Sequence, residues 1–495
     1  MLTYDDALRL KRVADGEAMS LAPADRDRLT AAGLIRVLAE QDVADIRAYT
    51  AATAQATAAR EQYRKALHLS GPEQMAEALL PKRRDRHEHE LRALQVTAGE
   101  LEHNCVGLRD NLAERDLLRV DLTLTTYCGA DSFVQTTRTG RLALLGFVHS
   151  AAASPGADVA QDRAQRFVSM RHELVDLSNE SECRLDLAGA ILVGHATDSE
   201  RFRALNHLAA GDNWQDDDRL PLLAALCSFE GDAESVWAAL VRNQAFVTEH
   251  GDTGGYRAAF VAAMMMGRCS DHTIHDIDEV AIARTNEIGA LLQTDGWTLA
   301  GQTDPVSATL SRACLLPADA VARSRWVTDE LHRGRPDSGT HFGYVSVALA
   351  ASNLYPVDFG ESEADGANRI LVLDEFTDRY DALVAGLPEQ QRTSLAPALL
   401  ALAPGTTADN LAAFTAISSA LAGEVGVEQM APVAVALACS RAPEWFDISQ
   451  HAWALACTLP LDARISGFGA DQHYPRYSYP WAGADLSMLA KYYQG

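Results

Sequence analysis

The feature that most constrains the fold is a short, almost wholly apolar segment that recurs seven times after residue 180. In most copies, a breaker and then a longer amphipathic segment follow it. A helix that is apolar on every side must be buried, whereas a helix with one polar face lies at the surface. Such pairs are typical of stacked α-hairpins, in which neighbours supply the burial that one pair lacks. The short segments span 187–194, 220–227, 256–267, 306–316, 342–351, 395–403 and 431–439.

The longer amphipathic segments complete the predicted pairs. They span 199–209, 233–250, 277–292, 318–333, 369–387, 408–425 and 444–457. This part of the chain resembles bacterial helical-repeat proteins in its Ala- and Leu-rich short helices. The fold class is therefore mainly α, with stacked α-hairpin repeats in either an open solenoid or a closed α/α toroid. The pattern alone does not choose between the two.

Charge divides the chain of 495 residues into unequal parts. The formal net charge is −25, of which residues 1–150 carry −2 and the remainder carries −23. The small-residue stretch 151–157 contains Pro155 and Gly156 and is a candidate linker. We therefore expect a module at 1–150, an acidic helical-repeat domain at 158–465 and an aromatic C-terminal cap with a terminal helix at 466–495. An acidic repeat domain is not expected to bind nucleic acid or an anionic membrane.

The first part of the chain predicts a helical hairpin. Helices are expected at 5–14, 23–35, 36–69 and 86–117, and the last two carry regular seams. Leucines and small residues recur at 3-4 spacing from Leu91 to Leu112, which is a heptad pattern. The helix at 36–69 has a narrower seam of alanine and tyrosine. The two seams could pair within the chain or, as a coiled coil between the 91–112 seams of two copies, form a homodimer.

A β-hairpin is predicted after the helical hairpin. Residues 119–127 alternate apolar and polar side chains, 128–132 have turn chemistry, and 133–137 form a second strand. The segments LTAAGLIR (29–36) and FVQTTRTGRLALL (133–145) resemble parts of bacterial winged-helix proteins, the second through its aliphatic-x-x-Thr-x-x-Gly-Arg pattern. The resemblance implies a wing-like element, split by the long hairpin, and DNA as a partner of residues 1–150. The alternative is a small α+β docking module.

Basic residues supply the candidate contacts to DNA phosphates. They are Lys82, Arg83, Arg84 and Arg86 at the hairpin tip and Arg138 and Arg141 on the wing.

Two acidic clusters could bind a metal ion. Carboxylate triplets can hold Mg²⁺ or Ca²⁺, and His and carboxylate pairs at i,i+4 spacing can hold a transition metal. The alternative for both is a helix-capping turn. The candidate ligands are Asp216, Asp217 and Asp218, and His272, His275, Asp276 and Glu279.

The C-terminal segment 468–481 is polar, aromatic and interrupted by two prolines, so it cannot be a regular helix. Tyr, Trp and Arg are the residue types that dominate binding hot spots. The segment could bind a ligand or partner, or cap the end of the array. The candidate binding residues are His473, Tyr474, Arg476, Tyr477, Tyr479 and Trp481.

No phosphate-loop, dinucleotide-binding, zinc-protease or nucleophile-elbow motif occurs, and no cofactor or catalytic residue is predicted. The eight cysteines are scattered, without a CxxC pair, and we expect free thiols. The chain begins without an apolar leader and contains no membrane-length apolar run, so we expect a cytoplasmic protein. The favoured function is a scaffold or regulatory protein that binds another macromolecule through the helical array, and a protein is the expected partner. The alternatives are a DNA-binding regulator with an acidic ligand-sensing domain and an enzyme acting in the cavity of an α/α toroid.

Overall fold

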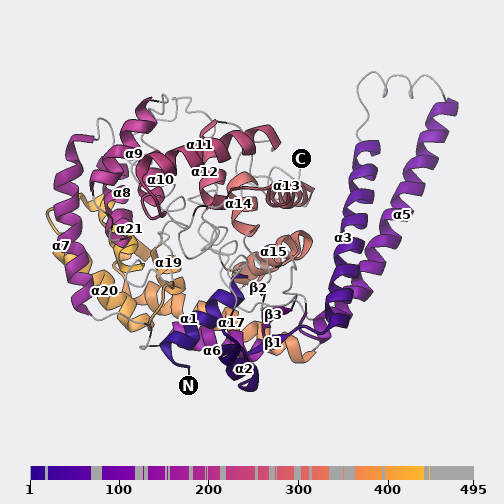
Figure 1. The fold of residues 1–495 in the computed structure, drawn as a ribbon, viewed down its shortest axis with the longest axis horizontal. Helices are drawn as coiled ribbons and strands as arrows, with labels where there is room; N and C mark the ends of the chain where they lie inside the picture. The colour runs from indigo at the N-terminus through magenta and orange to yellow at the C-terminus, as the bar shows by residue number, and fades with distance from the viewer. Residues whose placement is uncertain are drawn as a thin grey trace.

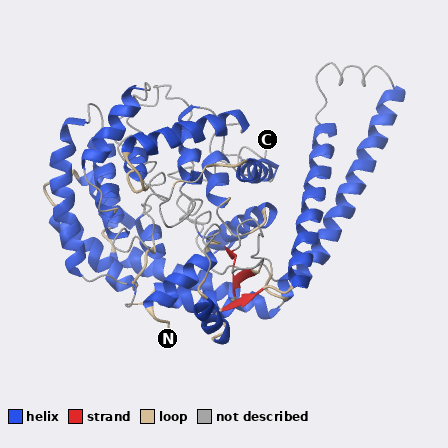
Figure 2. Cartoon of the chain, viewed as in Figure 1, coloured by secondary structure: helices blue, strands red, loops and turns tan. Residues whose placement is uncertain are grey.

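The computed structural model gives a mainly α-helical fold, as the sequence predicts (Figures 1 and 2). Among the described helices, none has the length and apolarity that crossing a bilayer requires. The structure describes residues 2–16, 21–67, 81–117, 126–127, 132–150, 153, 157–177, 182–195, 197, 199–211, 219–250, 255–266, 274, 276–294, 303–311, 315–333, 349, 363–392, 396–439 and 445.

The N-terminal module comprises three helices around a small sheet. Its elements are α1 (Tyr4–Ala14), α2 (Pro23–Ala31), β1 (Ile35–Val37), β2 (Thr126–Tyr127), β3 (Phe133–Thr136) and α6 (Arg138–Val148). The sheet order is β1-β3-β2, and both outer strands run antiparallel to β3. The predicted pairing of the last two strands is therefore present. The strand β1 was not predicted, and because it extends to Val37 the following helix begins at Glu40 rather than at 36.

Two long helices connect β1 to the rest of the sheet. They are α3 (Glu40–Leu67) and α5 (Pro81–Glu114), which pack against each other and stand out from the body as an arm (Figure 1). The seam of α5 is its least exposed face: Ala98 and Leu112 are buried, and Leu94, Leu101 and Cys105 are half-buried. The 91–112 seam is thus occupied by α3 of the same chain.

The described residues after the module are mainly helical. The long helices are α7 (Ala157–Leu174), α9 (Ser199–Gly211), α11 (Ala233–His250), α13 (Glu279–Thr294), α15 (Pro317–Arg333), α17 (Glu363–Gly386) and α20 (Thr407–Ala420). The short apolar helices are α8 (Glu182–Gly194), α10 (Arg219–Leu226), α12 (Gly255–Met266), α14 (Thr303–Leu310), α19 (Ala396–Leu402) and α21 (Val427–Cys439). Two further short elements are the 3-10 turn η2 (Val175–Leu177) and α18 (Glu389–Arg392).

These positions match six of the seven predicted short segments, while 342–351 and 444–457 lie outside the described residues except for Leu349 and Trp445. The sequence predicts that each short helix pairs with the long helix that follows it, and the contacts in the structure differ from this. In the structure α11 packs against α12, α13 against α14 and α20 against α21, so a long helix precedes its short partner. The helix α7, which was not predicted, is the long partner that precedes α8.

The last described helices of this part pack against its first ones, in both the outer layer of long helices and the inner layer of short helices. The short helices α8, α10, α12 and α14 contact one another in chain order, and α21 contacts both α19 and α8. In the outer layer α20 contacts α7 (Figure 1). The first and last described helix pairs of this part therefore lie side by side.

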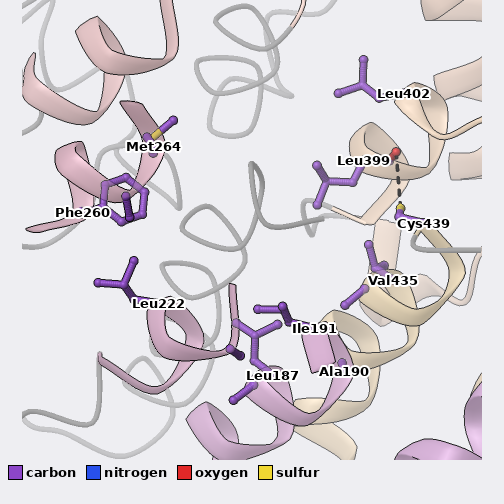
Figure 3. Close-up of a cluster of buried hydrophobic side chains, with 14 of the residues drawn as sticks. Leu187, Ala190, Ile191, Leu222, Phe260, Met264, Leu399, Leu402, Val435 and Cys439 are labelled. Atoms are coloured by element: carbon purple, nitrogen blue, oxygen red, sulfur yellow. Dashed lines mark hydrogen bonds between the residues drawn. The ribbon is translucent and has the colours of Figure 1, made fainter. Parts of the chain in front are cut away.

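One apolar cluster runs through the short helices, and its side chains are almost completely buried. Full burial of a large apolar side chain contributes about 1.5–3 kcal/mol, so this cluster is the main source of stability. Figure 3 labels members from five short helices: Leu187 and Ile191 of α8, Leu222 of α10, Phe260 and Met264 of α12, Leu399 of α19 and Val435 of α21.

Candidate functional site

The base of the arm is the best-defined candidate site, because polar groups are buried there between three helices. Tyr49 of α3 donates its hydroxyl to Asp319 of α15, 3.1 Å from Oδ1 and 3.0 Å from Oδ2. Arg109 of α5 places Nε 3.7 Å from Oδ1. Both helices of the arm thus meet one carboxylate of the C-terminal part. The distance from Arg109 is too long for a hydrogen bond, so that contact is an ion pair only.

Burial controls the electrostatics of this cluster. It raises the pKa of Asp319 to about 6, although the Arg109 charge and the Tyr49 hydroxyl act in the opposite direction. Burial, together with the charge of Asp319, also raises the pKa of Tyr49 above its ordinary value. The neighbouring thiol of Cys105 also has a raised pKa, chiefly because of burial. An acid with a pKa close to neutral can change its charge under physiological conditions.

Apolar side chains surround the cluster. Leu38, Ile46, Leu112, Phe133 and Leu316 are buried with Tyr49 in one group that joins the arm, the sheet and the start of α15. The site is therefore a mostly apolar contact between the arm and the start of α15. Such a contact is suited to hold the arm in place rather than to bind a small substrate.

A second polar cluster holds the module together around Asp116, which lies two residues after the end of α5 and adopts a positive φ of 57°. Its Oδ1 accepts a hydrogen bond from the buried Arg141 at 2.6 Å, and its Oδ2 accepts one from the backbone N–H of Arg138 at 3.0 Å. Its backbone carbonyl accepts hydrogen bonds from Arg36 and from Gln135. The end of the arm is thereby tied to the sheet and to the start of α6.

The wing-like sequence pattern has a structural explanation. Thr137 is the N-cap of α6 and accepts a hydrogen bond from the backbone N–H of Gly140 at 3.0 Å. A Cβ on Gly140 would lie 2.1 Å from the carbonyl oxygen of Leu34, so only glycine fits there. Arg141 also donates to the carbonyl of Thr136 at 2.8 Å. This places Arg141 inside the module, and the expectation that it faces DNA phosphates is corrected, since its guanidinium is buried and paired.

Other cations of the module are paired with carboxylates too. Arg28 contacts Asp6 and Asp25, Lys11 contacts Asp15, and Arg115 contacts Asp42 and Asp45. Arg138 is half-buried at the start of α6, and Arg86 is exposed near the start of α5. Lys82, Arg83 and Arg84 lie in the first turn of α5, and their side chains lie outside the described residues. Among the described residues of the module, Lys11, Arg28 and Arg115 are therefore paired with carboxylates of the module itself.

The module also contacts the C-terminal part at a second place. The backbone N–H of Gly405, after α19, donates to the carbonyl of Val148 at 2.8 Å. His149 pairs with Glu375 of α17, and Trp445 is buried against Tyr4 and Phe147. Burial lowers the pKa of His149 despite the neighbouring carboxylate. Two separate contacts thus fix the module to the helices.

Arginines on the long helices bind the C-terminal ends of the short ones, a feature that the sequence analysis missed. Arg163 of α7 donates to Val193 and Gly194, and Arg284 of α13 donates to Ser311 and Leu315. Arg201 of α9 donates to the carbonyl of Phe229, and Arg379 of α17 donates to three carbonyls after Leu400. The carbonyls of Val193, Gly194, Ser311, Ala401 and Ala403 lie at the C-terminal end of a short helix, where they have no partner within the helix and where the helix dipole favours a cation. Those of Phe229, Leu315 and Gly405 lie in the loops that follow.

The predicted metal residues are not brought together in the part of the chain that the structure describes. Asp216–Asp218, His272 and His275 lie outside the described residues. Asp276 is exposed and pairs with Arg242 of α11, while Glu279 begins α13. Across the described ranges, no three His, Cys, Asp or Glu side chains gather as a metal site would require. The predicted binding residues at 473–481 also lie outside the described residues.

Comparison of the chain with protein-family models, curated proteins and solved structures gives no match.

Proposed function

We propose that the protein is a scaffold or regulatory protein that binds another protein, and that the arm is the element that makes this contact. The observation that carries the proposal is the arm itself. Its helices have 28 and 34 residues, which at 1.5 Å per residue gives lengths of about 40–50 Å. Two helices that project this far from the core contribute little to it, and a projecting surface is suited to reach a partner (Figure 1).

The exposed face of α5 carries apolar side chains, which is evidence that the partner is a protein. Val96 is 57% exposed and Val106 is 47% exposed on this helix. Gly99 and Gly107 lie nearby with open space above them, so a partner helix could approach closely. Apolar side chains gain free energy when a protein covers them, whereas they gain little from a phosphate backbone. Because the 91–112 seam is already occupied by α3, a partner would use this outward face instead.

We further infer that the C-terminal part is a closed α/α toroid of repeated hairpins rather than an open solenoid. The contacts of α20 with α7 and of α21 with α8 support closure. The repeated arginine contacts at the ends of short helices support common descent of the hairpins from one unit. In this arrangement the toroid is the rigid support, and the arm is the contact element.

A photo-crosslinking residue placed at single valines tests the function. Positions Val96 and Val106 probe the arm, while Val175 and Val241, which are 61% and 40% exposed, are matched controls on the helical body. The proposal predicts a discrete protein adduct from the arm positions and none from the body positions. Adducts from the body positions alone would show that the array, not the arm, binds the partner.

Closure of the helical hairpins into a toroid also favours a second candidate function, an enzyme that acts in the central cavity of the toroid. Thermal-shift screening of the full chain against a metabolite library tests it. A ligand that stabilises the protein and is chemically altered by it would favour the enzyme over the scaffold. A DNA-binding regulator has less support from the described residues, because Arg141, one of the predicted phosphate contacts, is buried and paired with Asp116. Absence of salt-dependent DNA binding would remove that candidate.

A further inference from the structure

We infer that the outward face of α5 docks a second copy of this chain, with the two α5 helices side by side and antiparallel. The inference rests on the proposed function and deepens it, because it names the partner of the arm. The docking residues recur at spacings of four and three, and they lie half a turn round α5 from the seam that packs against α3. This outward stripe consists of Arg92, Val96, Gly99, His103, Val106 and Asp110.

The outward stripe is accessible to a partner. All of its residues are exposed, and its two valines, Val96 and Val106, are 57% and 47% exposed. Figure 1 shows α3 between α5 and the helical body, so the stripe is turned away from the other helices of its own chain. Covering the valines with another apolar surface would therefore be favourable and would not require the arm to move.

The charges of the stripe determine the direction of the second helix. If a two-fold axis passes near Leu101, Arg92 faces Asp110 of the second copy, and Val96 faces Val106 of the second copy. Symmetry repeats each of these pairs, so both ends of the contact carry opposite charges. A parallel arrangement would instead place Arg92 against Arg92 and Asp110 against Asp110, and like charges repel. The stripe is therefore complementary to itself in the antiparallel direction.

The centre of the contact allows the two helices to approach closely. Gly99 has open space above it and faces His103 of the second copy, so the missing side chain leaves room for the imidazole ring. Glu100 is exposed beside the stripe and would meet its own copy near the axis, which is unfavourable. The stripe is about 27 Å long from end to end. Because such a contact is small, we expect a reversible dimer whose population depends on protein concentration.

Sedimentation velocity on the full chain tests the inference at about 150 mM salt, where distant charges are screened. We expect a monomer at low protein concentration and a dimer that grows as the concentration is raised. Arg92→Glu places a glutamate against Asp110 at both ends of the contact and should weaken the dimer about 10-fold or more. Asp110→Arg should weaken it similarly, and the chain with both substitutions should dimerise as the wild type does. Within one helix the two residues are about 27 Å apart, so this rescue can arise only between copies.

Two control variants make the test specific. Arg47→Glu changes the charge of the arm equally on an exposed position of α3 and should leave the dimer unchanged. Glu100→Gln removes the repulsion near the axis and should strengthen the dimer. A monomer at every concentration would overturn the inference, as would equal weakening by Arg92→Glu and Arg47→Glu, or failure of the double substitution to restore the dimer.

Photo-crosslinking from Val96 separates this inference from the proposed function. Docking of a second copy predicts an adduct with twice the mass of the chain, in which the crosslink joins Val96 to the region around Val106. Discrete adducts with a different protein alone would overturn the inference and leave the proposed function of the arm in place.

Discussion

Replacing Arg379 with methionine tests whether arginines on the long helices hold the ends of the short helices. The guanidinium is buried and donates from Nε to Ala401 at 2.9 Å, and from its two terminal nitrogens to Gly405 at 3.0 Å and Ala403 at 2.8 Å. Methionine retains most of the apolar stem and none of the donors. The substitution therefore removes the donor to the carbonyls of Ala401 and Gly405, while the carbonyl of Ala403 keeps a hydrogen bond from Asn410 at 3.2 Å.

The expected loss of stability follows from these three contacts. A hydrogen bond from a charged donor contributes roughly 1.5–3 kcal/mol, and an unsatisfied buried group costs about 1–3 kcal/mol. Part of this is offset, because removing the guanidinium also removes the cost of burying its charge. The contacts share one side chain and do not add fully. We expect the free energy of unfolding to fall by about 3–5 kcal/mol.

Urea unfolding followed by circular dichroism measures the change, and Arg242→Met is the matched control. Arg242 also lies on a long helix, but its side chain is 60% exposed and its partner is the exposed Asp276. Exposed ion pairs contribute about 0–1 kcal/mol, so the control should unfold almost as the wild type does. A loss below about 1 kcal/mol in Arg379→Met, or equal losses in the two variants, would show that the guanidinium of Arg379 does not stabilise the helix end.

Three more substitutions have clear expected outcomes. Gly140→Ala should destabilise the N-terminal module by about 3 kcal/mol or more in thermal unfolding, because its Cβ would overlap a backbone carbonyl. Gly146→Ala on the same helix has open space and should be neutral or stabilising. Asp319→Asn should stabilise the chain above pH 6 by up to about 3 kcal/mol. The pKa of Asp319 is raised from 3.8 to about 6 in the folded state, so its ionisation destabilises the folded state as the pH rises through this range. Equal stability of the two proteins at pH 8 would contradict this. Ala56→Glu places a charge in the buried seam of the arm and should speed amide exchange along α3, whereas Ala54→Glu on its exposed face should leave exchange unchanged.

Local patterns in the sequence predicted the helices well. The heptad spacing from Leu91 to Leu112 is a property of one segment, and a short connection favours pairing with the preceding helix. The short helices could also be predicted from the sequence, because a helix that is buried on every side has no polar face and is therefore apolar throughout. The order within each pair was missed, because α7 carries an ordinary surface composition and offers no distinctive signal.

The candidate site at the arm base could not be predicted in the same way. Tyr49 and Asp319 are 270 positions apart, and neither stands out locally. Asp319 follows a proline at a helix start, where an acid is expected on dipole grounds alone. Tyr49 is one member of an alanine seam. The arginine contacts were missed for a related reason: a single arginine on an amphipathic helix normally belongs to the solvent face, and only the fold brings it to a helix end.

The binding affinity of a chain with a shortened arm shows whether the arm binds the partner. Residues 61–97 can be replaced by a short Gly-Ser turn that joins Arg60 to Ala98 and retains the ion pair between Arg60 and Glu102. Isothermal titration would then compare this chain with the full-length protein against the partner identified by crosslinking from Val96. We predict that the shortened chain binds this partner at least about 100-fold more weakly, a loss of about 2.7 kcal/mol, while its melting temperature is retained. An unchanged dissociation constant would show that the outer part of the arm, which includes Val96, does not bind this partner.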